Sequence, residues 1–312
     1  MVASAPAFAG GALRVVDVTG QFDRFAMSTA EMPDAQRLAA FEAQVGPIAD
    51  GFYARDRRPS HYDLRILANL RTYPERREAV LAVSRQFPQL FNKARRSFEA
   101  KFGPVTSDQP VFLIDSLGEL DGGTRELNGK RTLLFGADVI AEIHSGKDMT
   151  AFFHHELFHL YHEPKVTKCV AIWCALWEEG LATYVASRLD PNADDDALSL
   201  SAPEPIRPAV EANRAAAICA VARRLESTTD EDFADLFLAD SRLGSFPARM
   251  GYYIGYLVAA DVGRTHSLHQ MAELSLVQAR PLIDAALARM ATCRPNRVAE
   301  AHERSRSRRT GG

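Results

Sequence analysis

The chain of 312 residues contains no hydrophobic run that approaches the roughly 20 apolar residues needed to span a bilayer, so we expect no transmembrane segment. It also lacks a concentration of basic charge. The formal net charge is −3 at pH 7, and Lys and Arg are mixed with Asp and Glu along most of the chain. A nucleic-acid-binding protein normally gathers basic residues on one face, so we expect no nucleic-acid partner. The composition, 46% hydrophobic and 25% charged, is that of an ordinary globular protein.

Internal repeats are missing, and the two ends differ in composition from the rest. Residues 1–20 contain Ala-Phe-Ala at positions 7–9, which matches a signal-cleavage site, but a basic start and a full apolar core are lacking. This leader is therefore either the stub of an export signal or an unstructured N-terminus. The protein is accordingly either exported, to the periplasm or outside the cell, or cytoplasmic. Residues 301–312 are rich in arginine and are expected to form a basic disordered tail.

Cysteine is scarce, and no pair has a convincing metal-site spacing. Cys169 and Cys174 are five apart, which would turn them about 140° away from each other on a helix, so they pair only if that stretch is not helical. Cys219 and Cys293 lie in helix-like runs, where a buried free thiol is the commoner state. Any metal ion should therefore be held by histidine and carboxylate.

Apolar periodicity predicts a mainly helical α+β protein with one small antiparallel sheet. Residues 31–101 carry apolar residues at spacings of three and four, and the arginine-rich part, 55–77, is expected to be a solvated helix face. Residues 111–115 predict a buried strand. Residues 124–135 predict a hairpin with a type I′ turn at Asn-Gly. Helical periodicity then persists to about residue 300, interrupted by loops at 190–208 and 241–247.

The central motif is His-His-Glu-Leu-Phe-His over residues 154–159, within an expected helix that Asp148 caps and Pro164 ends. His155 and His159 are four apart, so on a helix they project from one face and can bind a single ion. Glu156 lies about 100° round from His155, beside the ion, where a base can take a proton from water. The pattern predicts a catalytic zinc ion, with Leu157, Phe153 and Leu160 anchoring the helix in the core.

A third ligand is expected in Trp-Glu-Glu-Gly-Leu-Ala-Thr-Tyr, residues 177–184. Two histidines and one carboxylate leave an open position on zinc for water. Glu178 and Glu179 differ by about 100° on a helix, so only one of them can face the metal. We predict Glu179, and expect the neighbouring Gly180 to let this helix approach the zinc helix closely. The flanking apolar residues describe a buried helix, in which a carboxylate needs a partner such as a metal.

These two motifs resemble those of the gluzincin zinc peptidases, in which a Glu-Gly-Leu-Ala segment follows His-Glu-x-x-His. The resemblance covers roughly residues 135–190 and is closest to an uncharacterised group of predicted bacterial zinc-dependent proteases. It implies a zincin-like fold, one Zn²⁺ ion per chain, and a peptide or protein substrate. In the aminopeptidase branch the ligand Glu directly precedes the Gly, which favours Glu179. The spacing from His159 is one residue longer than in that branch, which keeps Glu178 open, and the exopeptidase motif of that branch is missing.

Several further residues have two interpretations each. Thr183 either supports a metal ligand or packs the helix, and His162 either contacts substrate or is exposed, the second being preferred. Tyr252 or Tyr253 could stabilise an oxyanion, with Arg249 binding a carboxylate. In the other interpretation this segment is a helix in which the nearby glycines at 251 and 255 admit a neighbouring helix. In gluzincins a strand placed like residues 132–135 pairs with substrate.

The sequence thus predicts a zinc-dependent hydrolase, most readily a peptidase, with Glu156 as general base and His155, His159 and Glu179 as ligands. The catalytic unit is expected over residues 21–300, with the sheet and zinc helix at about 105–165 and a helical lobe at about 166–300. The alternative is a non-catalytic zinc-binding or scaffold protein that retains the same helices. The intact Glu156 argues against this alternative, because a structural zinc needs no base.

Overall fold

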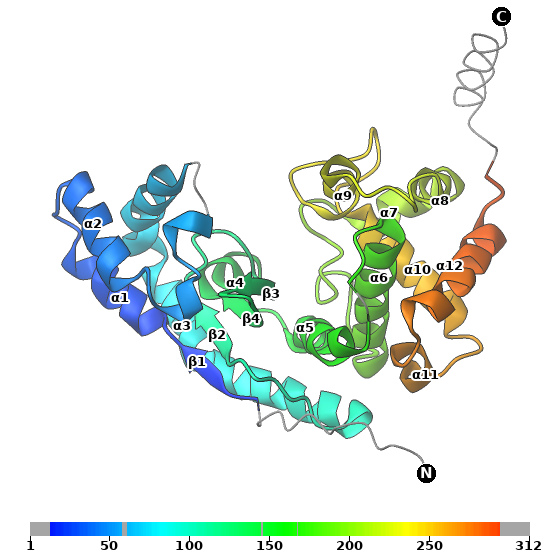
Figure 1. Ribbon diagram of the computed structural model, residues 1–312, viewed down its shortest axis with the longest axis horizontal. Coiled ribbons are helices and arrows are strands. Elements are labelled where there is room, and N and C mark those ends of the chain that lie inside the picture. The colour runs from blue at the N-terminus through cyan, green and yellow to red at the C-terminus, as the bar shows by residue number, and fades with distance from the viewer. Residues whose placement is uncertain (1–12, 58–60, 145, 167, 294–312) are drawn as a thin grey trace, which may run out of the picture. The chain divides into compact units, whose positions relative to one another are not determined.

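The computed structural model describes most of the chain as helices around one small sheet (Figure 1). It describes residues 13–57, 61–144, 146–166 and 168–293. The chain divides into two compact units. The first comprises Met1–Val166 and Val185–Ser199, and the second comprises Thr167–Tyr184 and Leu200–Gly312. Most of the expected leader and all of the expected basic tail lie outside the described residues.

The sheet of the first unit has four strands in the order β1-β2-β4-β3. β2 runs parallel to both β1 and β4, and only β3 and β4 are antiparallel. The expectation of an antiparallel sheet is therefore wrong, because the sheet is mixed. Parallel neighbours need long crossover connections, and here helices between β1 and β2 supply one. The bounds are β1 Val15–Asp17, β2 Val111–Ile114, β3 Gly122–Leu127 and β4 Lys130–Gly136.

The predicted hairpin is confirmed. β3 and β4 pair from Gly122 with Phe135 to Leu127 with Lys130. The two turn residues, Asn128 and Gly129, have φ angles of 49° and 73°. Positive φ at both central positions defines the type I′ turn, whose twist matches that of the flanking strands.

Helices α1 to α5 belong to the first unit, and α3 is the longest of them. It runs through Pro74 and Pro88. α1 and α4 contact β2, while α3 contacts α1, α4 and α5. The bounds are α1 Thr19–Ser28, α2 Asp34–Gln44, α3 Tyr62–Phe102, α4 Ala137–Ile143 and α5 Thr150–His162.

The arginine-rich stretch is only partly a solvated face, contrary to expectation. Arg76 on α3 reaches Asp115, at the end of β2, with Nη1 2.7 Å from Oδ2 and Nη2 3.2 Å from Oδ1. Asp115 is fully buried, and burial, followed by the neighbouring carboxylate of Asp138, raises its pKa to about 7. Arg65 donates to the carbonyl of Leu117. These arginines therefore bind the loop that follows β2.

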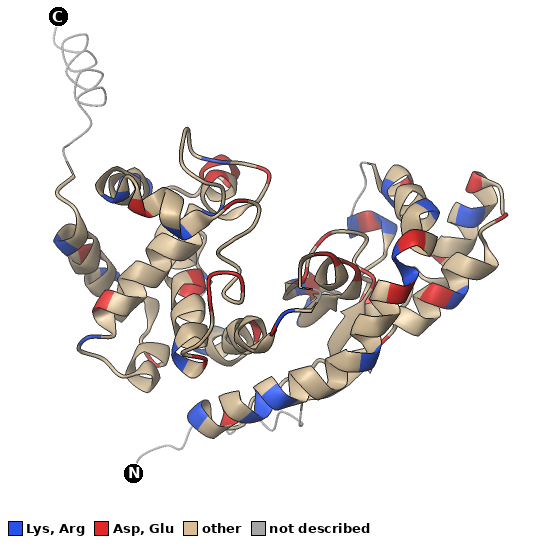
Figure 2. Cartoon of the chain, turned by 180° about the vertical axis from the view of Figure 1, so that it is seen from behind, with Lys and Arg blue, Asp and Glu red and all other residues tan. Residues whose placement is uncertain are grey.

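Helices α6 to α12 belong to the second unit, apart from the last residues of α6. Figure 2 shows acidic and basic residues interspersed over the helices of both units. Among the described residues, none of the helices is long and apolar enough to cross a membrane. The bounds are α6 Ile172–Leu189, α7 Ile206–Glu211, α8 Arg214–Ala222, α9 Asp230–Phe237, α10 Met250–Val262, α11 Leu268–Ala272 and α12 Leu276–Met290.

Glycines fix the contact between α6 and α10. A Cβ added to Gly180 would overlap the backbone of Gly255, and one added to Gly255 would overlap the carbonyl of Leu176. Gly180 therefore admits α10, and the prediction that it admits the zinc helix is wrong. The packing interpretation of the α10 glycines is confirmed, since a Cβ on Gly251 would lie 2.8 Å from the carbonyl oxygen of Leu236.

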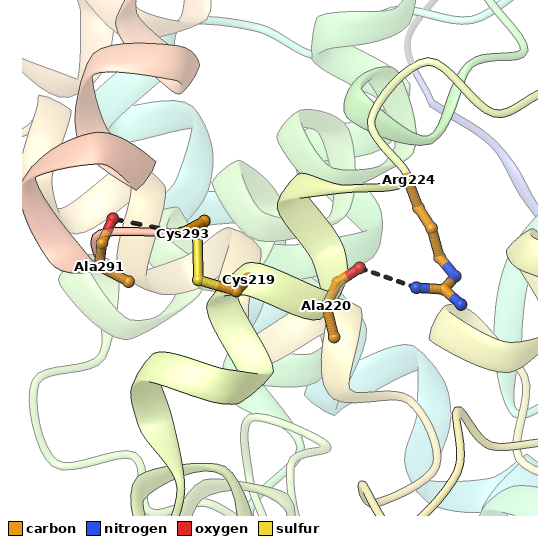
Figure 3. Close-up of a disulfide and its surroundings, with 5 residues drawn as sticks. All are labelled: Cys219, Ala220, Arg224, Ala291 and Cys293. Carbon is orange, nitrogen blue, oxygen red and sulfur yellow. Dashed lines mark hydrogen bonds between the residues drawn. A yellow bond between two sulfur atoms is a disulfide. The ribbon is translucent and has the colours of Figure 1, made fainter. Parts of the chain in front are cut away.

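The second unit contains two disulfides, which pair all four cysteines. Cys169, just before α6, pairs with Cys174 in its first turn, which meets the condition that the stretch is not wholly helical. Cys219 on α8 pairs with Cys293, which follows the end of α12 (Figure 3), with Cα atoms 5.3 Å apart. The free-thiol interpretation of these two residues is wrong. The two cysteines are 74 residues apart in the sequence, so no local pattern could indicate that they pair.

Candidate metal centre

The zinc helix predicted from the sequence is α5, and its ends are those expected. The Asp148 carboxylate accepts hydrogen bonds from the backbone N–H and hydroxyl of Thr150, at 2.8 and 2.6 Å. These bonds satisfy the first turn of the helix and hold the pKa of Asp148 below its usual value. α5 ends at His162, and Pro164 lies in the short 3₁₀ turn that follows.

Aromatic packing orients α5. Phe153 is fully buried, and its ring meets those of Phe87 and Phe91 on α3 edge-on, with centroids 5.5 Å apart in both cases. Leu157, one turn later, is also fully buried. His154 faces α3 as well, with Nε2 2.7 Å from Ser97 Oγ, and burial lowers its pKa. This face anchors the helix, and His154 is directed away from the predicted metal ligands.

His155 and His159 occupy another face of α5 and are half-buried. Their Nε2 atoms lie 2.9 Å apart, and their ring centroids are 4.6 Å apart. The ligand atoms of His155, His159 and Glu179 all lie within 4.8 Å of one another, so this group could hold a metal ion. Glu178 is not in the group.

The donor set can be tested against the geometry of a metal site. Two imidazole nitrogens bound tetrahedrally at 2.0–2.1 Å would be about 3.3 Å apart. The observed 2.9 Å between the Nε2 atoms of His155 and His159 is close to that value and requires only small ring rotations. A carboxylate oxygen within 4.8 Å of both nitrogens can complete a three-ligand set. The residues present therefore fit a metal ion held by two imidazoles and one carboxylate.

The second unit fixes the start of α6, the helix that carries Glu179. The N–H groups of Ile172 and Trp173 donate to the carbonyls of Ser227 and Leu225, at 2.9 and 3.1 Å. The Cys169–Cys174 disulfide closes the same turn. Trp177, just before Glu178, is fully buried. The expectation of a buried helix at this position is confirmed.

Glu156 is buried, with 7% of its surface exposed, and lies against the first residue of β3. A Cβ on Gly122 would be 3.1 Å from Glu156 Cγ and 2.7 Å from Phe152 Cζ, so only glycine fits there without displacing these side chains. Gly122 was not among the residues predicted from the sequence. The Gly-Gly pair at 122–123, which begins the hairpin, was the available signal, because such a pair often marks a close approach to backbone.

Known proteins offer no assignment. Comparison with protein-family models, with curated proteins and with solved structures finds no match. The resemblance to gluzincins therefore rests on the motifs alone, and the function must be argued from the residues of the site.

The tyrosines of α10 have different environments. Tyr253 is buried and donates its hydroxyl to Glu211 Oε1 at 2.6 Å. Burial, followed by this hydrogen bond, raises the pKa of Tyr253 to about 12. The Arg249 guanidinium lies 4.6 Å from the centre of the Tyr252 ring and donates to the carbonyl of Ala202. The Tyr253 hydroxyl is thus engaged in the fold.

Three smaller predictions have different outcomes. His162 is buried, with its ring stacked on Phe158 at 5.1 Å, so the preferred expectation of an exposed side chain is wrong. Thr183 is buried, and its hydroxyl donates to the carbonyl oxygen of Glu179 at 2.8 Å, a bond within the helix.

Leu134, in the strand expected to pair with substrate, is already paired with β2 and β3 on its two sides. Within the described sheet, β3 is the edge strand beside α5.

Proposed function

We propose that the protein is a zinc-dependent hydrolase and that its substrates are peptides or proteins. One observation carries the proposal: ligand atoms of His155, His159 and Glu179 lie within 4.8 Å of one another, and Glu156 directly follows the first of them. Two imidazoles with one carboxylate are a donor set of catalytic zinc sites, whereas structural zinc sites are usually closed by four ligands, mostly cysteine. In this chain the described cysteines are all in disulfides.

Zinc, when bound, supplies a Lewis acid that polarises a carbonyl group and acidifies a water molecule. His155, His159 and Glu179 would hold it as a three-ligand set, which suits a catalytic rather than a structural site. The half-buried setting of both histidines keeps them accessible to a substrate while their helix is fixed by the core.

Glu156 is the general base of the proposed reaction. Its carboxylate accepts a proton from the attacking water as the carbon–oxygen bond forms, and delivers it to the leaving amine as the carbon–nitrogen bond breaks. Glu156 is buried, with Gly122 close to its Cγ atom, which limits the freedom of the side chain. A base held in this way loses little entropy on reaching the transition state.

β3 is proposed as the strand along which an extended substrate lies. It is the edge strand beside α5, and its first residue touches Glu156. A peptide added to this edge would gain backbone hydrogen bonds largely independent of its side chains, which suits a hydrolase acting on peptides. This assignment replaces the strand expected from the sequence.

The test is the Glu156→Gln variant assayed on a broad peptide library. Glutamine keeps the size of the side chain but cannot accept the proton, so the variant should retain its metal and lose at least about a hundredfold in rate. Glu142→Gln, an exposed position on α4, is the matched control and should keep full activity. Equal activities for wild type and Glu156→Gln would refute the role of Glu156, and an inert wild type would favour the scaffold alternative.

A further inference from the structure

A buried histidine and an aspartate lie beside the proposed site without being part of it. His144, at the C-terminal end of α4, is 6% exposed. Its Nε2 atom lies 3.1 Å from Oδ2 of Asp121, the residue that precedes β3. A hydrogen bond from a buried histidine to a half-buried carboxylate joins the two elements, because breaking it leaves a buried polar group unsatisfied.

Asp121 fixes the start of β3 through hydrogen bonds of its carboxylate and of its backbone carbonyl. Oδ1 accepts the backbone N–H of Gly122 at 2.9 Å, while Oδ2 faces His144. Its carbonyl accepts the N–H of Gly136, at the end of β4, at 2.9 Å. The carboxylate and carbonyl thus connect the edge strand to β4 and to α4.

The same pair reaches the zinc helix by two routes. The first runs from Asp121 to Gly122, whose Cα faces Phe152 and Glu156 so closely that a Cβ would be 2.7 Å from the phenyl ring. The second is direct, since the His144 ring lies against the Phe152 ring with centroids 4.7 Å apart. Because the interior is close-packed, a shift of Gly122 or Phe152 displaces Glu156.

We propose that His144 and Asp121 form a positioning pair, which holds the start of the edge strand β3 against α5 so that Glu156 stays in place. Neither residue is among the predicted metal ligands, and the pair acts on Glu156 through Gly122 and Phe152. Its effect on turnover rests on the proposed hydrolase function, whereas its hold on β3 does not depend on that function.

Two substitutions at His144 separate its two contacts. His144→Phe keeps a ring against Phe152 and removes the hydrogen-bond donor to Asp121. His144→Gln keeps a donor and gives up the ring. His266→Phe, in the second unit, is the matched control, because its hydrogen bonds are local, to Thr265 and the carbonyl of Val262.

The first readout is amide hydrogen exchange of the peptide that covers residues 120–127, with the metal bound. His144→Phe should exchange faster there by about tenfold, because the amide of Gly122 loses a fixed acceptor, while His144→Gln should recover part of the protection. The control should match the wild type. Unchanged exchange in His144→Phe would overturn the proposal whatever the activity of the enzyme.

The second readout is turnover. In His144→Phe, kcat should fall about tenfold with metal content unchanged, and His144→Gln should recover part of the loss. Faster exchange with unaltered kcat in an active enzyme would overturn the link to Glu156. A wild type that hydrolyses no peptide would instead refute the proposed function, and the exchange measurement would still decide whether the pair holds the strand.

Discussion

The Nε2 atoms of His155 and His159, the two predicted metal ligands one helical turn apart on α5, lie 2.9 Å from each other. Their common face follows from the four-residue spacing and from the anchoring of the opposite face by Phe153 and Leu157. The proposed activity depends on whether these histidines, with Glu179, bind zinc.

The third ligand can be tested directly by comparing two neighbouring glutamates. Glu179→Ala should weaken zinc binding by at least about a hundredfold, because a ligand is lost, whereas Glu178→Ala should change it little. The zinc affinities of the two variants can be compared by competition with a chromophoric chelator. The reverse order would assign the metal to Glu178.

The glycine contact between α6 and α10 predicts a large effect of one methyl group. Gly180→Ala should lower the free energy of unfolding by roughly 3 kcal/mol, because its Cβ would overlap the backbone of Gly255. Gly20→Ala, inside α1, is the control. Its Cβ would be 3.7 Å from Arg24, an ordinary contact, so this variant should be neutral or slightly stabilised. Equal chemical-denaturation midpoints for both variants would contradict the packing described.

The buried carboxylate of Asp115 predicts a pH dependence of stability. Burial raises its pKa from 3.8 to about 7 in the folded protein. Between these values the folded protein holds a proton that the unfolded chain has released. The contribution of Asp115 to the free energy of unfolding therefore falls as the pH rises from about 4 to 7, and levels off above that. Urea titrations across this range should show the decline, and Asp115→Asn should flatten it. An equally steep decline in Asp115→Asn would exclude this residue as its source.

The two disulfides should differ in how much they contribute to the free energy of unfolding. Removing Cys219–Cys293 by a double serine substitution should cost about 4 kcal/mol, because the bond closes a loop of 74 residues. Removing Cys169–Cys174, which are five apart, should cost about 2 kcal/mol. Thermal melts of the two variants under non-reducing conditions check the order. A larger loss for the shorter loop would mean that chain entropy is not the main contribution.

The features of the fold that depend on neighbouring residues could be predicted from the sequence. Asn128 and Gly129 predicted the hairpin because few residues accept positive φ at two successive positions. The N-terminal cap of α5 was predicted from Asp148, whose short carboxylate can accept hydrogen bonds in the first turn. The side of α5 expected to face a metal was predicted from the four-residue spacing of His155 and His159. The sequence could not reveal β1, a strand of three residues whose pairing partner begins at Val111. Short strands of this kind are defined by a distant neighbour.

Predictions that needed a packing partner were less successful. Gly180 was correctly seen as a point of close approach, but the residue alone does not say which helix approaches. His162 lies in a histidine-rich helix and was expected to be exposed, whereas its ring is stacked on Phe158 in the core. The pairing of Cys219 with Cys293 and the contact of Gly122 with Glu156 depend on chain segments far apart in sequence.

The most direct test of the account is metal analysis of the full chain purified without added zinc. Wild type should contain about one equivalent of zinc per chain, and His155→Ala should lose it while its helical content, measured by circular dichroism, stays the same. His266→Ala, in the second unit, should retain the metal. A wild type that carries no zinc and takes up none on dialysis against it would contradict the central claim.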